Sequence, residues 1–371
     1  MLYNVCIEIC YACFHCLFKT HQKPSEIPQL YFHRTPQNNA IIHRLNAVKY
    51  YAPLWWACNP MAQTFLLEFL YNYLKILPTY PIYRQYVVTD DAQILLLDWI
   101  HFQEAPRAIL CIFPGLVGTT DACYNKPWFQ LCKQMNYSAV VVNRRGFHKD
   151  APLDCHAKRL PTYMDAQDMR CAMDAIQRRF PTSPKFGIGY SAGGNHLIGC
   201  VHEHPDIHSI LKGVINISCG NDVLKCQDIT KSSSYLGRLL TWGPREMCAH
   251  NQAHPFYKML QCANPCCIEQ YDAHYAHTLG FPDIPSYYRS CSTIHCLERI
   301  TLPTLCVMSQ DDPLMQCGHR EDYISIAASN HNIITVITRQ GGHCAWIQNN
   351  FKSWVNELIV EYIEALLEKI N

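Results

Sequence analysis

The stretch KFGIGYSAGGNHLIGC, residues 185–200, places a single serine, Ser191, inside a cluster of glycines after a short apolar run. Gly189 to Gly193 read G-x-S-x-G, a pattern in which a sharp strand-to-helix turn holds a serine hydroxyl clear of a sheet. Alone the pattern is weak, because average Gly and Ser frequencies produce it by chance in roughly one chain in ten of this length. Here a strand-like run, KFGI, precedes it and a helix-like run, NHLIGCV, follows it, which favours an exposed nucleophile over an ordinary glycine-rich turn.

From residue 80 onward the chain alternates strand-like and helix-like blocks. This alternation predicts an α/β fold with a mostly parallel central sheet flanked by helices. Buried strands are predicted in RAILCIFPG, YSAVVVNRRG, LKGVINIS, ITLPTLCVMSQDDP and HNIITVITRQGGH. The alternation breaks over residues 221–286, which are irregular and rich in aromatic residues, Cys and His. A break of that length within a compact sheet predicts an inserted helical cap.

A serine hydroxyl is a weak nucleophile near neutral pH, so it needs an imidazole to take its proton and a carboxylate to orient that imidazole. In an α/β-hydrolase the chain order is Ser, then Asp or Glu, then His. Asp311 and Asp312 follow one predicted strand, and His343 follows the last one on a Gly-Gly turn. We predict Asp312, beside Pro313, as the acid, His343 as the base and Asp311 as a turn cap.

A tetrahedral oxyanion needs two backbone N–H donors, one from the residue after the serine and one from the loop after an early strand. Ala192 follows the serine, and Leu116 in CIFPGLVGTT is the candidate for the second donor. The alternative for Leu116 is an ordinary strand-ending turn. In VVNRRG, Arg144 and Arg145 could contact a phosphate head group, but a structural role for the pair is favoured.

Composition narrows the classes of partner. With 371 residues and 49% hydrophobic content the chain can bury one large core. Its 31 Lys and Arg balance 30 Asp and Glu, so no net field attracts nucleic acid and no nucleic-acid partner is predicted. The 22 cysteines are scattered, which favours buried free thiols in a reducing compartment over a disulfide framework. The sequons at Asn136 and Asn216 are interpreted as chance matches, because Asn216 lies in a predicted buried strand.

No cofactor and no metal is predicted. Cys6, Cys10 and Cys13 spell C-x3-C-x2-C, a spacing used for iron–sulfur clusters, but the segment opens the chain with no preceding strand. Because cluster ligation needs a preformed cage, we interpret the match as accidental.

Residues 1–20 are predicted to form an amphipathic helix that lies on a membrane surface, because Asn4, Glu8, Tyr11 and His15 share one stripe and apolar residues the other. The alternative is a helix docked on the protein itself. The polar, Pro-containing residues 21–50 are predicted as a linker, and residues 51–371 as the catalytic domain. This predicts a membrane-associated protein with its catalytic domain on the cytoplasmic, reducing side.

Several motifs together resemble the abhydrolase domain-containing lipases of the membrane-anchored α/β-hydrolase group. These are FPGLVGTTDACY, VVNRRG, GIGYSAGGN and RQGGHCAW, within a similarity over about residues 45–365. That group includes monoacylglycerol lipases, yeast medium-chain acyl ester synthases and esterases, and bacterial YheT-like hydrolases. The resemblance implies the α/β-hydrolase fold, Ser191 as nucleophile, Asp312 as acid, His343 as base and an N-terminal membrane anchor. The chain departs from the group in its short anchor segment, which carries Glu8, and in its His- and Cys-rich lid.

The predicted function is hydrolysis of carboxylic esters of lipid-like substrates, such as a monoacylglycerol, a phospholipid or a medium-chain ester, through an acyl-enzyme on Ser191. The predicted partners are this lipid or ester substrate and a membrane surface; protein partners are not predicted. Two alternatives stay open. One is acyl transfer to an alcohol by the same triad, because water and alcohol compete for the same intermediate. The other is a catalytically inactive scaffold or binding protein of the same fold.

Overall fold

The computed structural model describes residues 25–54, 59–78, 80–116, 118–231, 233–315 and 318–370. The predicted N-terminal helix over residues 1–20, with Cys6, Cys10 and Cys13, lies outside the described residues. Among the described residues, no helix is both long enough and apolar enough to cross a membrane.

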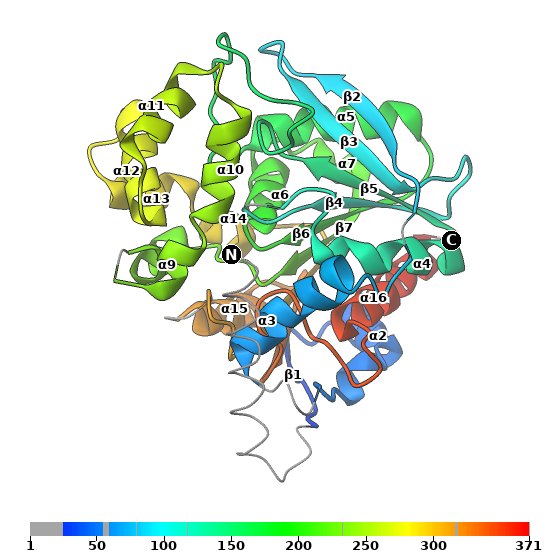
Figure 1. The fold of residues 1–371 in the computed structure, drawn as a ribbon. Coiled ribbons are helices and arrows are strands. Elements are labelled where there is room, and N and C mark those ends of the chain that lie inside the picture. Colours follow the sequence, from blue (N-terminus) through cyan, green and yellow to red (C-terminus); the bar gives the residue numbers. More distant parts are fainter. Residues whose placement is uncertain are drawn as a thin grey trace.

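A nine-stranded sheet forms the centre of the described chain, in the order β1-β9-β8-β7-β6-β4-β5-β3-β2 (Figure 1). The strands from β4 to β9 run parallel, whereas β1, β2 and β3 pair antiparallel with their neighbours. Every residue of β4 and β5 is buried, as expected for strands covered on both faces. The predicted mostly parallel sheet is therefore confirmed. The strands are β1 (Gln29–Phe32), β2 (Tyr83–Val88), β3 (Ile94–His101), β4 (Ala108–Phe113), β5 (Tyr137–Asn143), β6 (Lys185–Tyr190), β7 (Leu211–Ile217), β8 (Thr304–Ser309) and β9 (Ile333–Thr338).

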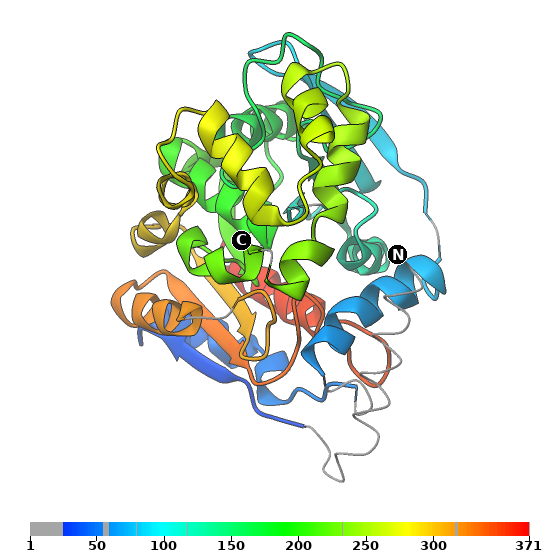
Figure 2. The same ribbon diagram turned by 60° about the vertical axis from the view of Figure 1, so that its left-hand side comes forward.

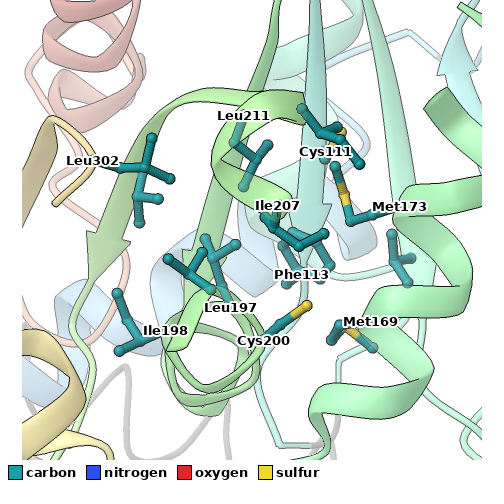
Figure 3. Packing of buried hydrophobic residues seen from close by; sticks show 14 of the residues in the cluster. Cys111, Phe113, Met169, Met173, Leu197, Ile198, Cys200, Ile207, Leu211 and Leu302 are labelled. Carbon is teal, nitrogen blue, oxygen red and sulfur yellow. The ribbon is translucent and has the colours of Figure 1, made fainter. Parts of the chain in front are cut away.

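Helices cover both faces of the sheet, each over its own apolar layer. One face carries α5 (Ala166–Arg179), α6 (Ala192–Glu203), α7 (Ile207–Ile210), α14 (Ile294–Glu298) and α15 (His319–Ser329). The opposite face carries α2 (Pro36–Arg44), α4 (Lys126–Met135) and α16 (Trp354–Ile370). The helix that follows Ser191 is thus fixed by packing. Figure 3 shows its side chains in one layer with those of α5 and β4: Leu197, Cys200, Met169, Met173, Cys111 and Phe113.

The segment predicted as a linker over residues 21–50 is part of the folded domain from residue 25 onward, so that prediction is wrong for its described part. β1 pairs with β9 at the sheet edge, with Leu30 opposite Val336. α2 begins after Thr35, whose side chain accepts a hydrogen bond from the backbone N–H of Asn38, and it buries Ile41. Polar composition was misleading because only one side of these short elements faces the core.

The predicted cap over residues 221–286 is helical and continues to Cys291. It has an apolar core of its own, which includes Met247, Leu260 and Tyr288. Figures 1 and 2 show its longer helices grouped beside the sheet rather than stacked on either face. The helices are η4 (Val223–Cys226), α8 (Gln227–Thr230), α9 (Tyr235–Leu239), α10 (Trp242–His250), α11 (Pro255–Ala263), α12 (Ile268–Thr278) and α13 (Ile284–Cys291).

Candidate active site

Ser191 lies at the junction of β6 and α6 in a strained conformation, with φ 52° and ψ −126°. A non-glycine residue at positive φ costs about 1–3 kcal/mol and persists only where the surroundings impose it. Here the Ser191 N–H donates to the Ile217 carbonyl at 2.8 Å, and the Gly194 N–H donates to the Ser191 carbonyl at 2.9 Å. The turn between strand and helix is the one that the G-x-S-x-G pattern predicts.

Two glycines of the motif are required by close backbone contacts. A Cβ at Gly193 would lie 2.0 Å from the carbonyl oxygen of Phe113. A Cβ at Gly189 would lie 2.5 Å from the Cα of Gly194. Both distances are far below van der Waals contact with backbone, so any side chain at either position displaces the turn that carries Ser191.

Asp312 and His343 are in contact, as predicted. Nδ1 of His343 lies 2.9 Å from Oδ2 and 3.0 Å from Oδ1 of Asp312. The Asp312 carboxylate is buried, and its Oδ1 also accepts a hydrogen bond from the Leu314 N–H at 2.8 Å. The carboxylate is thereby fixed, and it orients the imidazole with the Nδ1 proton toward the acid and Nε2 free for the nucleophile.

Burial lowers the pKa of His343, but Asp312 and, after it, the neighbouring Cys344 thiol together raise the pKa more strongly, through charge and hydrogen bonding. The net result is a His343 pKa well above its ordinary value. The imidazolium that forms after proton transfer is therefore stabilised, which is the task of the acid in a Ser–His–Asp arrangement.

Asp311 has a different task from its neighbour. Its Oδ1 accepts a hydrogen bond from the Gly342 N–H at 3.0 Å, so it holds the turn that precedes His343. Burial raises the pKa of Asp311 to about 6. The preference for Asp312 as the partner of His343 agrees with this geometry.

The loop that carries His343 is braced by α3 (Pro60–Glu68), which the sequence analysis did not connect with the site. The His343 N–H donates to Oγ1 of Thr64 at 2.9 Å, and that hydroxyl donates to the Pro60 carbonyl at 2.8 Å. Gln63 Oε1 accepts from the Ile347 N–H at 3.1 Å. Polar side chains within an otherwise apolar helix were the available signal for this contact.

The loops of Ser191 and His343 meet at the end of β7. Ile217 accepts from the Ser191 N–H, and the next residue, Ser218, accepts from the Cys344 N–H at 3.2 Å. Within the described ranges, no hydrogen bond joins the Ser191 hydroxyl to the His343 imidazole. Such contacts commonly shorten only when substrate binds. The structure thus pairs Asp312 with His343 and places Ser191 at the end of β6, which one strand, β7, separates from β8.

The two predicted oxyanion donors are Ala192, the residue after the serine, and Leu116, in the loop that follows β4. In the part of the chain that the structure describes, the backbone N–H groups of Leu116 and Ala192 have no hydrogen-bond acceptor. The loop after β4 lies against the nucleophile, because a Cβ at Gly115 would be 3.2 Å from the Cβ of Ser191. Unpaired N–H groups in this loop and directly after the serine suit a developing negative charge.

Arg144 and Arg145 are both buried but differ in surroundings. Arg145 forms ion pairs with Asp91 at 2.8 Å and with Asp168 at 2.5 Å, so the predicted structural role fits this residue. Arg144 donates instead to the backbone carbonyl of Leu116 at 2.9 Å. Of the two arginines, only Arg144 therefore forms a hydrogen bond with the loop that follows β4.

One group of side chains in the described residues could hold a metal ion. Ligand atoms of His202, at the end of α6, and of His295 and Cys296, in α14, lie within 4.8 Å of one another. This group is at the far end of α6 from Ser191, so it is separate from the Asp–His pair. It was not identified from the sequence, because the three residues are brought together only by helix packing.

The strand order, the strained serine turn and the Asp–His pair define an α/β-hydrolase of the serine hydrolase class. The chain matches the family described as serine aminopeptidase S33 over residues 104–346, and it belongs to this family. The predicted α/β-hydrolase fold and the predicted family resemblance are thereby confirmed.

Curated relatives agree with this assignment. The chain is similar to bovine phospholipase ABHD3, with 23% identity over 86% of this chain and 79% of the relative. It is similar to a zebrafish monoacylglycerol lipase ABHD2, with 20% identity over 94% and 85% of the two chains. The putative esterase YheT of Escherichia coli is 24% identical over 86% and 94%. Among solved structures, an esterase of Pyrococcus furiosus shares the fold, with a TM-score of 0.50, 15% identity and coverage of 77% and 92%.

Proposed function

We propose that this protein hydrolyses carboxylic esters of lipid-like substrates through an acyl-enzyme on Ser191. Ser191 Oγ attacks the ester carbonyl carbon while its proton passes to Nε2 of His343. The oxyanion is held by the N–H groups of Leu116 and Ala192. When the carbon–oxygen ester bond breaks, the leaving alcohol takes the proton from His343. Water then attacks the acyl-enzyme, gives a proton to His343 and releases the acid as Ser191 regains its hydrogen.

The contact between Asp312 and His343 is the observation that carries this proposal. A buried carboxylate on Nδ1 leaves Nε2 as the basic nitrogen and stabilises the charged imidazole. The strained turn at Ser191 and the unpaired N–H groups beside it support the same reaction.

A lipid-like substrate is supported by the cap and by the relatives. The cap offers an apolar and aromatic interior, which includes Met247, Leu260 and Tyr275. The relatives are called phospholipase, monoacylglycerol lipase and esterase, whereas the family description names an aminopeptidase. Esters are therefore the first substrates to test, with a matching amide as a comparison.

We further propose that residues 1–20 hold the enzyme on the cytoplasmic surface of a membrane. The amphipathic pattern of that segment supports an interfacial helix. The cysteines of the described ranges are all free, which supports a reducing compartment. Sedimentation with vesicles of the full chain and of a chain lacking residues 1–20 tests this: equal binding of both overturns the interfacial helix.

A fluorophosphonate probe tests the nucleophile directly. We expect covalent labelling of the wild type, loss of labelling in Ser191→Ala and retained labelling in Ser209→Ala, an exposed serine on α7. Turnover of monoacylglycerol, lysophospholipid and short-chain esters is measured on the same proteins. Labelling that persists in Ser191→Ala, or no turnover of any ester, contradicts the proposal, and complete absence of labelling supports the inactive scaffold. Ester synthesis exceeding hydrolysis in the presence of an alcohol supports acyl transfer instead.

A further inference from the structure

A small cavity lies where the cap meets the loops that follow β4 and β5. It encloses about 40 Å³, room for about three water molecules and too little for an acyl chain. The lining is not purely apolar. It combines a guanidinium, a carboxylate and several phenol groups, and it includes Leu116, Arg144, Phe147, Tyr163, Asp272 and Tyr275.

Arg144 brings a buried positive charge to this cavity. The residue is only 4% exposed, and in the described ranges its guanidinium forms no salt bridge. Two of its N–H groups donate to the backbone carbonyls of Leu116 and Thr162, and its guanidinium lies 4.4 Å from the ring centroid of Phe147. A guanidinium has five N–H donors, so about three are left for another acceptor.

A buried charge without a counter-ion is costly, because the hydration that it loses is not replaced. Burial lowers the pKa of Arg144, and the acid that acts on it most strongly, Asp165, forms no ion pair with it. The charge of its neighbour Arg145 is compensated in the usual way, because two carboxylates contact that guanidinium directly. The missing partner of Arg144 points to an anion that arrives from outside.

Asp272 is the one acid among the described residues that line the cavity. Its carboxylate accepts hydrogen bonds from the hydroxyls of Tyr163 at 3.0 Å and Tyr288 at 2.6 Å, not from Arg144. Burial raises the pKa of Asp272 to about 7, so near neutral pH this group carries only part of a negative charge. The cavity therefore keeps a net positive character.

We propose that Arg144 binds an anionic group of the ester substrate, so that the enzyme prefers esters with a negative charge close to the scissile bond. This inference rests on the proposed esterase function. One residue, Leu116, offers its N–H to the oxyanion and its carbonyl to Arg144. The path from the ester carbonyl to the anionic group runs through the Leu116 N–H, the Leu116 carbonyl and the guanidinium, so three hydrogen bonds of about 2.9 Å and the width of these groups limit the separation to roughly 10 Å. A phosphoryl group or a carboxylate a few bonds from the ester meets this requirement, and both bind a guanidinium through two oxygens.

The test compares esters that share one acyl chain. The three substrates are a neutral monoacylglycerol, the same acylglycerol bearing a phosphate, and the same acyl chain esterified to glyceric acid, which carries a carboxylate. In the wild type we expect kcat/KM for at least one anionic ester to exceed that for the neutral ester. The arm that shows the larger preference identifies the anion as phosphate or carboxylate.

Arg144→Gln and Arg144→Lys then assign the preference to the guanidinium. In Arg144→Gln we expect the ratio of kcat/KM for the anionic ester to that for the neutral ester to fall by roughly 10- to 100-fold, the usual range for charge-assisted hydrogen bonds. Arg144→Lys should recover part of this ratio. Arg178→Gln, in the last turn of α5 and beside β2, is the matched charge control.

An equal loss for both esters in Arg144→Gln means that Arg144 only positions the Leu116 loop, and this overturns the proposal. A wild type that prefers the neutral ester overturns it as well. If Arg144→Gln does not fold, calorimetric titration of Ser191→Ala with glycerol phosphate and with glycerol tests binding directly, and equal affinities overturn the proposal. A wild type that turns over no ester while Ser191→Ala still binds glycerol phosphate refutes the esterase function and leaves the anion site standing.

Discussion

Asp312 and His343 follow adjacent parallel strands, β8 and β9, and a hydrogen bond of 2.9 Å joins Oδ2 of the acid to Nδ1 of the base. Parallel strands bring their carboxyl ends to one edge of a sheet, so residues 31 positions apart in the chain come into contact. This contact is the best-defined part of the site, because each of the two residues also forms hydrogen bonds with other parts of the chain.

Asp312→Asn should leave the fold intact and lower kcat by a factor on the order of 10³–10⁴, because an amide stabilises neither the required tautomer nor the imidazolium. Steady-state kinetics on a monoacylglycerol measure this loss. Asp311→Asn is the matched control. An amide oxygen can still accept from the Gly342 N–H, so the decrease in kcat should be at least about tenfold smaller than in Asp312→Asn. Equal losses in the two variants contradict the assignment of Asp312.

The pH dependence of kcat/KM should reflect the raised pKa of His343. The imidazole must be neutral to accept the serine proton, so activity should rise with pH and reach half its plateau above about 6.5, the ordinary value for histidine. Removing the charge of Asp312 should move this midpoint to lower pH. An acid limb at the same pH in the wild type and Asp312→Asn is the contrary outcome.

The raised pKa of His343 also makes stability depend on pH, but its contribution to stability falls with rising pH, whereas activity rises. Because the pKa of His343 is raised by folding, its interaction with Asp312 stabilises the protein fully below the unfolded pKa, about 6.5, and this contribution is lost as pH rises through the folded value. Urea unfolding at several pH values, compared between the wild type and Asp312→Asn, measures it.

The strain at Ser191 predicts a difference between two inactive variants. Glycine adopts φ 52° without steric cost, whereas alanine retains the strain, so Ser191→Gly should be more stable than Ser191→Ala by about 1 kcal/mol. Thermal unfolding of both variants under identical conditions is the measurement. A lower melting temperature for Ser191→Gly would show that the turn is not strained.

Thr64 lies in α3 and not in the sheet, yet its substitution should affect activity. Thr64→Val removes the acceptor for the His343 N–H and leaves that group buried, at a cost of about 1–3 kcal/mol, and it loosens the turn of the base. We expect a lower kcat and a lower melting temperature. Thr64→Ser keeps the hydroxyl and should restore most of both. If Thr64→Ser behaves like Thr64→Val, the hydrogen bond has no role.

The cysteines should divide by exposure in an alkylation experiment. Burial raises the pKa of Cys111 and Cys306 to about 12, so these thiols should react only after unfolding. Cys155, Cys262 and Cys266 are exposed and should react in the native protein. Peptide mass spectrometry after timed labelling separates the two sets, and fast modification of Cys111 or Cys306 in the native state contradicts the packing.

Much of the sheet could be predicted because its strands are continuous apolar runs that end in glycine, proline or aspartate. The runs around Ile109 and Val140 need no tertiary information to be recognised, and the order of Ser191, Asp312 and His343 follows from one topology. β1 could not be found this way. It is four residues long, its first residue is exposed, and its pairing with β9 is fixed by contacts about 300 residues away.

The environments of adjacent polar residues could not be predicted from the sequence either. Arg144 and Arg145 are consecutive and identical in type, yet one meets two carboxylates and the other faces a cavity. Successive side chains leave the backbone in different directions, and only the packed cap decides what each one meets. The brace between Thr64 and His343 was hidden for the same reason.

The antiparallel pairing of β1 with β9 joins Gln29 to Ile337. During synthesis the ribosome releases the first of these partners long before it makes the second, so this edge of the sheet can close only after β9 has been made. A nascent chain stalled before residue 333 contains β1 to β8, but β1 then has no strand to pair with, because its partner is β9. β9 thus holds β1 in place at the edge of the sheet, and the turn that carries His343 follows β9 in the chain.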